Sequence, residues 1–171
     1  MPIYALGDRT PQIHPDAFVH PDAVVIGDVR IGAWSSIWPC AVLRGDYGTI
    51  IVGKRTSIQD GTVIHATREL ATVIGDECVV GHLAHLEGCT VHDRVLIGNG
   101  SIVLHEAVVH RGATVAAGAV VRNLVEVPAN AAAMGVPASI RLDFSNEDEI
   151  VQSAELYVNN AKRYKEELRL L

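Results

Sequence analysis

A set of polar side chains in the first half of the chain has the types and spacing of a metal centre. The set is Arg44, Asp46, Gln59, His65, His82, His85 and Glu87. Neutral imidazole is a preferred ligand of Zn²⁺ and of other borderline transition metals. An arginine that is followed two residues later by a carboxylate can hold that carboxylate by a charge-assisted hydrogen bond. The sequence therefore predicts a metal site built from histidines, with an ion pair and an amide beside it.

The remaining histidines give weaker signals. Four of these histidines have no partner at a matching position of the repeat that is described below. They are His14, His20, His92 and His110. We expect these four to be surface residues. His105 follows the cluster by one repeat, and we expect it to support the site from behind or to face solvent. The metal hypothesis therefore depends on the other three histidines.

Apolar residues recur every six positions and predict the scaffold that must hold these groups. One uninterrupted run is Ile13, Val19, Val25, Ile31, Ile37 and Leu43. Neither a 3.6-residue helix nor a simple two-residue strand alternation keeps this phase for so long, whereas the short repeats of a solenoid do. The period predicts an all-β solenoid, a parallel β-helix in which three six-residue repeats form one triangular coil.

The repeat is interrupted between Leu43 and Val52, between Ile64 and Ile74, and between Leu86 and Val91. When successive repeats are assigned in turn to three faces, the inward residues of the second face are Val19, Ile37, Ile58, Val80 and Ile97. Those of the third face are Val25, Leu43, Ile64, Leu86 and Val103. Every interruption then falls between the third face and the first. Loops gathered at one edge are typical of an active site.

The same assignment predicts how the polar residues are displayed. Arg44, His65 and Glu87 each directly follow an inward residue of the third face, so they should form an outward ladder with a spacing of about 4.8 Å. Gln59 and His82 belong to the second face. Side chains on different faces of a rigid prism do not converge easily within one chain. We therefore expect a closed cyclic assembly, a homotrimer, with its sites between subunits.

The composition agrees with a narrow core and excludes several classes of function. Of all residues, 49% are hydrophobic but only 5% are aromatic, and the net charge of −6 gives no footprint for nucleic acid. No run of about 20 apolar residues could span a bilayer, and the N-terminus lacks the pattern of a signal peptide. We expect Cys78 inside the core and Cys40 and Cys89 at outward or corner positions. An odd number of cysteines favours reduced thiols and a cytoplasmic location.

The period changes near residue 145. Residues 145–148 have the sequence Ser-Asn-Glu-Asp, which is typical of a helix N-cap followed by an acidic first turn. An apolar stripe at helical spacing then predicts a helix from about 146 to 170. We expect two parts, residues 1–144 as a β-helix with an N-terminal cap and residues 145–171 as an amphipathic helix packed on it. A core role is expected for Tyr157 and Tyr164.

Several motifs together resemble those of the γ-class carbonic anhydrase family. They are Arg44-Gly45-Asp46, Ser57-Ile58-Gln59-Asp60-Gly61, Val63-Ile64-His65, Val80-Gly81-His82 and Glu87-Gly88-Cys89-Thr90. The resemblance extends to residues 132–138 and the closing helix, so it covers essentially the whole chain. It implies a left-handed β-helix of hexapeptide repeats, a homotrimer, and a Zn²⁺ ion, or Fe²⁺ or Co²⁺, held by three histidines across subunits.

The resemblance also implies roles for individual residues. His65 and His82 match two metal ligands, and Gln59 matches the residue beside the metal-bound water. Arg44 and Asp46 match an ion pair between subunits. The implied reaction is the reversible hydration of CO₂ to bicarbonate by a metal-bound hydroxide, with a small-molecule substrate and neither nucleic acid nor membrane as a partner.

The sequence departs from the family pattern at the third ligand. The family places a histidine five residues after the Gly-His histidine, where this chain has Glu87. His85 is an extra histidine, and both residues flank the inward Leu86, so either side chain can face the same metal. We favour His85 as the third ligand and keep Glu87 as the alternative. Glu69, in the longest interruption, is the obvious carboxylate for proton transfer.

Other functions fit the same scaffold. A third ligand that departs from the pattern is compatible with weak activity, or with a metal-binding or scaffold trimer that is not a catalyst. Hexapeptide-repeat acyltransferases share the β-helix and bind a CoA thioester between subunits. They use one histidine as a general base and do not need the arginine, aspartate, glutamine and histidine series found here.

Overall fold

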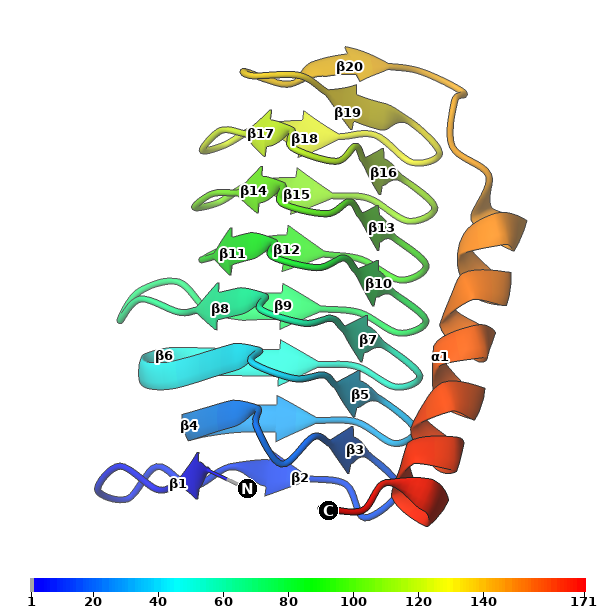
Figure 1. The fold of residues 1–171 in the computed structure, drawn as a ribbon. Coiled ribbons are helices and arrows are strands. Elements are labelled where there is room, and N and C mark those ends of the chain that lie inside the picture. The colour runs from blue at the N-terminus through cyan, green and yellow to red at the C-terminus, as the bar shows by residue number, and fades with distance from the viewer. Residues whose placement is uncertain (1) are drawn as a thin grey trace.

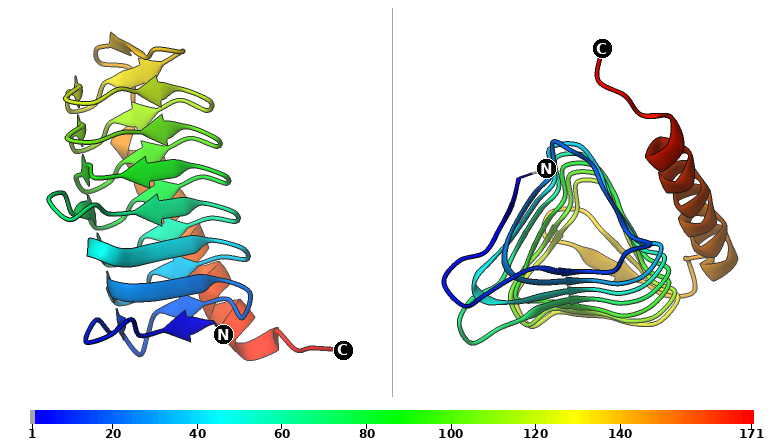
Figure 2. Two further views of the ribbon diagram at one scale, coloured as in Figure 1. Left: turned by 90° about the vertical axis from the view of Figure 1, so that its left-hand side faces the viewer. Right: turned by 90° about the horizontal axis from the view of Figure 1, so that it is seen from below.

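The computed structural model describes residues 2–171, and Met1 of the predicted N-terminal cap lies outside the described residues. The chain winds into a parallel β-solenoid of triangular cross-section, with a helix along one side (Figures 1 and 2). The predicted fold class is confirmed as a left-handed hexapeptide-repeat β-helix with a C-terminal helix.

The first and third faces form one hydrogen-bonded sheet because β4 and β6 continue around the edge between them. The strands of these faces are β1 (Ile3–Tyr4), β2 (Gln12–Ile13), β4 (Val24–Ile31), β6 (Val42–Val52), β8 (Val63–His65), β9 (Thr72–Ile74), β11 (His85–Glu87), β12 (Thr90–Val91), β14 (Ile102–Val103), β15 (Val108–Val109), β17 (Val120–Val121) and β18 (Glu126–Val127). At the open end, β1 and β2 pair with β4, as expected for a cap.

The second face is a separate sheet. Its strands are β3 (Phe18–Val19), β5 (Ser36–Ile37), β7 (Ser57–Ile58), β10 (Val79–Val80), β13 (Leu96–Ile97), β16 (Thr114–Val115), β19 (Ala132–Met134) and β20 (Ser139–Arg141). All neighbours pair in parallel except the last two, which are antiparallel and end the solenoid.

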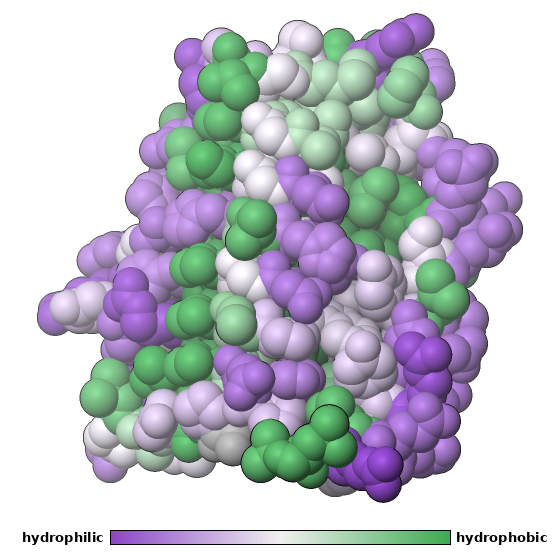
Figure 3. All heavy atoms as spheres, in the orientation of Figure 1, coloured by the Kyte–Doolittle hydropathy of each residue, from purple (hydrophilic) through white to green (hydrophobic). Residues whose placement is uncertain are grey.

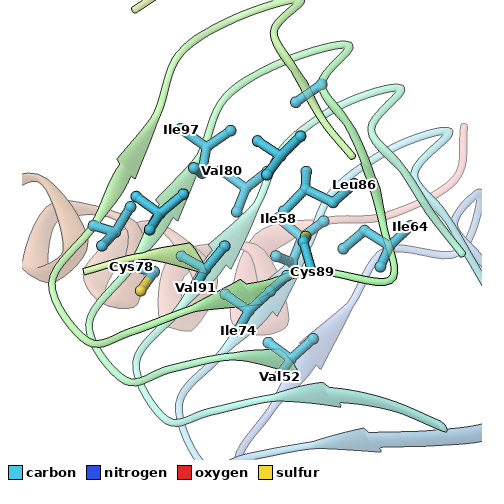
Figure 4. Packing of buried hydrophobic residues seen from close by; sticks show 14 of the residues in the cluster. Val52, Ile58, Ile64, Ile74, Cys78, Val80, Leu86, Cys89, Val91 and Ile97 are labelled. Carbon is cyan, nitrogen blue, oxygen red and sulfur yellow. The ribbon is translucent and has the colours of Figure 1, made fainter. Parts of the chain in front are cut away.

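The six-residue period correctly identifies the core. Leu43, Ile64 and Leu86 stack in register on the third face and are completely buried. Figure 4 shows Ile64 and Leu86 within this core. Burying an aliphatic side chain of this size contributes about 1.5–3 kcal/mol, so the repeated column accounts for much of the stability. The interruptions lie at the edge between the third and first faces, where the β8–β9 loop protrudes on the left of Figure 1.

The expectation for Cys89 is wrong. Its side chain is 1% exposed and belongs to the core (Figure 4). The short step between Leu86 and Val91 removes a residue from the corner, so Cys89 occupies the small inward position that Ala107 fills in the next coil. Cys78 is buried as predicted, and Cys40 is exposed. Burial raises the pKa of both buried thiols to about 12.

The C-terminal helix α1 (Glu147–Glu167) is shorter at both ends than predicted. The Asn146 side chain caps it by accepting a hydrogen bond from the Asp148 amide. The helix packs against β3, β5, β7 and β10 of the second face through Ile150, Ala154, Val158 and Ala161. Tyr157 and Tyr164 pack on Trp38, as expected for core residues. The predicted boundary after residue 144 falls between β20 and α1.

The helix is also tied to the solenoid by charge. The Glu147 carboxylate accepts hydrogen bonds from Arg94 at 2.7 Å and from Arg111 at 2.9 Å. These bonds lower the pKa of the Glu147 carboxyl. The outer surface of the helix is hydrophilic in Figure 3, on the right. No helix within residues 2–171 has the length and hydrophobicity needed to cross a bilayer.

Candidate metal centre

The predicted ladder forms on the third face. Arg44 at the end of the third-face part of β6 pairs in register with His65 of β8, and His65 pairs with Glu87 of β11. Each residue follows an inward aliphatic side chain, so all three side chains leave the prism in the same direction. The sequence alone was sufficient to predict this row.

His65 lies between two carboxylates. Its Nδ1 atom is 2.6 Å from Glu87 Oε1, and its Nε2 atom is 3.0 Å from Asp46 Oδ1. The ring is largely enclosed, with its side chain 14% exposed. Ionised carboxylates only accept hydrogen bonds, so both contacts are satisfied together when the ring carries a proton on each nitrogen. A metal that binds either ring nitrogen must therefore displace the carboxylate that contacts it.

The two carboxylates are stabilised in their charged form. Burial opposes ionisation of Asp46, but hydrogen bonds from His65 and Arg44 outweigh it and lower the pKa of that carboxyl. Burial likewise opposes ionisation of Glu87. The hydrogen bond from His65 and the nearby imidazoles of His105 and His85 lower the pKa of Glu87. Arg44 and Asp46 form an ion pair within one chain.

The backbone that carries His65 is held by a buried hydroxyl. The Thr72 side chain donates to the carbonyl oxygen of His65 and accepts a hydrogen bond of 2.8 Å from the Gly88 amide. Thr72 has no solvent exposure. One hydroxyl therefore connects the end of β8, the start of β9 and the turn after β11, which are the segments around the cluster.

Two further histidines approach Glu87. His85 Nε2 and His105 Nε2 lie 3.5 Å and 3.7 Å from Glu87 Oε2. Both distances are too long for a good hydrogen bond. The Nε2 atom of His105 is buried and has no hydrogen-bond partner among the described residues. His105 thus supports the cluster from the next coil, one of the two placements that the sequence predicted.

His82 lies at another corner, as the faces of the prism predict. It follows β10 in the turn between the second and third faces. Its Nδ1 atom is 2.9 Å from Asp60 Oδ2, and its side chain is 45% exposed. A carboxylate on one ring nitrogen fixes the orientation of the ring and leaves the other nitrogen for a metal. No contact joins His82 to His65 within residues 2–171.

Two other candidates also stay apart from the cluster in one chain. Gln59 follows β7 on the second face and is 4% exposed, and its side chain makes no hydrogen bond to another described residue. Glu69 is exposed in the β8–β9 loop and forms no ion pair with the rest of residues 2–171. The sequence did not identify Tyr47, whose ring lies edge-on to His65 at 6.5 Å, or Thr72.

The expectation that His92 and His110 have no partner is wrong. Their rings stack at 5.2 Å with an interplanar angle of 12°. Each follows an inward valine of the first face in consecutive coils, so the ladder rule that found His65 and Glu87 would also have found this pair. The Nε2 atom of His110 also lies 3.2 Å from Glu126 Oε2.

The donor set fits a transition metal in kind but is incomplete in one chain. Among residues 2–171, no group of three or more histidine, cysteine, aspartate or glutamate side chains converges as a metal site. His65 and His82 each have an orienting carboxylate, as ligating histidines commonly do. They lie at different corners of the prism, so one chain does not bring these two histidines together.

Comparisons with known proteins agree with this fold. The family model described as bacterial transferase hexapeptide (six repeats) matches residues 10–45 and 88–123. The chain is 42% identical over 163 residues to gamma carbonic anhydrase 2, mitochondrial, of Arabidopsis thaliana, which covers 91% of this chain and 59% of the relative. It therefore spans about 60% of the length of that plant protein.

Two bacterial proteins match over more of their own length. The carnitine operon protein CaiE of Proteus sp. is 38% identical over 148 residues, covering 86% of this chain and 75% of the relative. The crystal structure of a putative acetyltransferase from Bacillus cereus superposes with a TM-score of 0.93 at 33% identity, over 96% of each chain. The chain belongs to the hexapeptide-repeat family that includes the γ carbonic anhydrases and CaiE.

Proposed function

We propose that this chain is a metal-dependent, carbonic anhydrase-like enzyme that interconverts CO₂ and bicarbonate at sites between the subunits of a homotrimer. The observation that carries the proposal is the arrangement of two oriented histidines. His65 is held by Glu87 on the interrupted edge, and His82 is held by Asp60 at a different corner. The resemblance to gamma carbonic anhydrases supports the same function.

We propose His65, the His82 of a neighbouring copy, and His85 as the metal ligands, with Glu87 as the alternative third ligand. The contact of 2.6 Å between Glu87 and His65 Nδ1 favours an orienting role for Glu87, since a ligating histidine usually gives its second nitrogen to a carboxylate or carbonyl. Zn²⁺ is the metal we favour, with Fe²⁺ and Co²⁺ as the other candidates.

The other residues near His65 have roles that follow from their contacts. Asp46 must leave His65 Nε2 before a metal binds there, and Arg44 can retain its carboxylate when it does. When bound, a divalent ion lowers the pKa of a coordinated water to about 7, which makes hydroxide available at neutral pH. Gln59 would hold CO₂ or orient the nucleophile, and Glu69 would carry the proton away. Tyr157 is a poor proton carrier, because burial raises the pKa of its hydroxyl, as does the charge of Asp60.

We also propose a reducing compartment. The three cysteines of the protein are free, and two of them are buried without forming a disulfide. This agrees with the cytoplasm, and equally with the mitochondrial location printed in the names of the plant relatives.

The experiment combines metal analysis with stopped-flow measurement of CO₂ hydration. The wild-type protein loaded with Zn²⁺, Fe²⁺ or Co²⁺ is expected to accelerate hydration, and His65→Ala is expected to lose both metal and activity. Comparison of His85→Ala with Glu87→Gln identifies the third ligand, since the ligand variant loses metal and the orienting variant retains most of it. Tight metal binding without any hydration would instead favour the scaffold function.

An acyltransferase is the second candidate. The matching family model is one of bacterial transferases, and the Bacillus cereus structure bears the name of a putative acetyltransferase. Calorimetry with acetyl-CoA separates the two functions. Saturable binding of acetyl-CoA together with inactivity toward CO₂ would favour the transferase.

A further inference from the structure

The β8–β9 loop is a compact, ordered turn beside His65. The Thr67 amide donates to the Leu70 carbonyl oxygen at 3.1 Å, and the Leu70 amide donates to the Thr67 hydroxyl at 3.1 Å. This pairing closes the loop and leaves Arg68 and Glu69 at its tip. The protrusion is visible on the left of Figure 1, and Figure 3 shows that it is hydrophilic.

Arg68 is folded back from this tip toward the cluster. Its guanidinium carbon lies 5.4 Å from the centre of the Tyr47 ring, and the Tyr47 ring is edge-on to His65 at 6.5 Å. A cation over an aromatic face is attracted by the ring quadrupole, so this stack gives the guanidinium a defined position. His65, Tyr47 and Arg68 therefore form a row that leads from the candidate metal centre to solvent.

The charge of Arg68 is not neutralised within the described chain. Arg68 is exposed, and no carboxylate of residues 2–171 lies within ion-pair distance of it. Arg44, the other arginine near His65, is already engaged by Asp46. A guanidinium has planar N–H donors that match a carboxylate or bicarbonate in a two-point contact. An uncharged molecule such as CO₂ gains little from such a group.

We propose that Arg68, positioned by Tyr47, binds the anionic member of the substrate pair, bicarbonate or a small carboxylate of the same shape, at the mouth of the site. The inference rests on the proposed function and adds to it the residue that recognises the charged species. Arg68 distinguishes bicarbonate from CO₂ by charge and by its two-point hydrogen bonding.

The test measures anion binding separately from catalysis. Metal-free protein is titrated with sodium bicarbonate and with sodium formate, and the NMR signals of the Arg68 Nε–H group and the Tyr47 ring are followed. We expect saturable shifts in the wild-type protein. The Arg68→Ala variant, followed through Tyr47, should bind either anion about tenfold more weakly, since the lost hydrogen bonds are charge-assisted. In the metal-loaded enzyme, the inhibition constant of bicarbonate against CO₂ hydration should rise by a similar factor.

Matched variants separate recognition from general charge effects. Arg122→Ala removes an exposed arginine of the same third-face row, two coils beyond Glu87, and should leave anion binding unchanged. Tyr47→Phe keeps the ring and should retain anion binding, whereas Tyr47→Ala should weaken it. Thermal unfolding and sedimentation of each variant check the fold and the assembly.

Each outcome bears on the proposal. Equal anion affinity in wild type and Arg68→Ala would overturn it, as would the absence of anion binding in the wild type. Smaller assemblies of Arg68→Ala would also overturn it, because Arg68 would then act on a neighbouring subunit. If Arg68→Ala loses anion binding but the wild-type protein does not hydrate CO₂, the proposed function is refuted and the anion site remains supported.

Discussion

Thr72 offers a sharp test of how the fold positions His65. Replacing Thr72 by valine keeps the shape and the β-branch but removes a hydroxyl with two buried partners, the His65 carbonyl oxygen and the Gly88 amide. The side chain has no solvent exposure, so water cannot replace the lost bonds without rearrangement. The perturbation acts on the backbone of the site and removes none of its ionisable groups.

The expected cost follows from the two groups left behind. A buried amide left without a partner costs about 1–3 kcal/mol, and loss of the bond to the carbonyl adds about 0.5–1.5 kcal/mol. We expect Thr72→Val to lower the free energy of unfolding by about 2–4 kcal/mol. For a chain of this size each kcal/mol shifts Tm by about 2–4 °C, so the total shift should be about 5–15 °C.

The assay is urea and thermal unfolding at one fixed protein concentration, because the stability of an oligomer depends on concentration. Thr62→Val is the matched control, since the buried Thr62 hydroxyl donates a single bond of 2.9 Å to the Gly81 carbonyl oxygen. It should cost about 0.5–1.5 kcal/mol. Thr72→Ser keeps the hydroxyl and should retain much of the stability. A Thr72→Val protein within about 0.5 kcal/mol of wild type would show that the Thr72 hydroxyl does not hold the backbone at His65.

Three further predictions concern the rest of the molecule. Because burial raises the pKa of Cys78 and Cys89 to about 12, a thiol reagent at pH 8 should modify only Cys40 in the native protein and all three thiols after unfolding; rapid labelling of a second thiol would contradict the buried core. The pKa of Glu147 in the native protein is lower than its unfolded value of about 4.3. The ion pairs of Glu147 with its two arginines therefore stabilise the fold above the unfolded pKa, and this stabilisation is lost as the pH falls through the native pKa. The stability difference between wild type and Glu147→Gln in urea should therefore be present at pH 6 and vanish toward pH 3, and a difference that grows in acid would oppose this account. Leu86→Ala should cost about 2–5 kcal/mol in urea unfolding, since Leu86 is completely buried, and a cost below 1 kcal/mol would mean that the column is not tightly packed.

The sequence predicted the prism well because a single repeated rule determines it. One inward aliphatic residue in every six is enough to identify Leu43 and Ile64 as neighbours in adjacent coils, and structure and period agree there. The rule fails where the step changes. Cys89 lies inside because the five-residue step moves the corner, which counting from Leu86 in sixes does not reveal.

The candidate site was predictable as a set of positions and not as a set of contacts. The ladder rule places His65 next to Glu87, but the carboxylate of Asp46 reaches His65 Nε2 only because the residues after Gly45 bend around the edge. Tyr47 and Arg68 lie in interruptions of the repeat, where no period predicts the direction of a side chain. His92 and His110 were within reach of the rule, because they follow Val91 and Val109 in adjacent coils, yet they were predicted to have no partner.

Whether His65 and His82 of different subunits form one site can be tested by mixing two defective variants. His65→Ala and His82→Ala should each bind no metal and hydrate no CO₂. When the two are unfolded, mixed in equal amounts and refolded, every mixed trimer should contain one intact site, with His65 from one copy and His82 from its neighbour. We expect recovery of about a quarter of the wild-type metal content and activity, the fraction given by random assembly of closed trimers. A mixture as inactive as its two components would contradict this expectation.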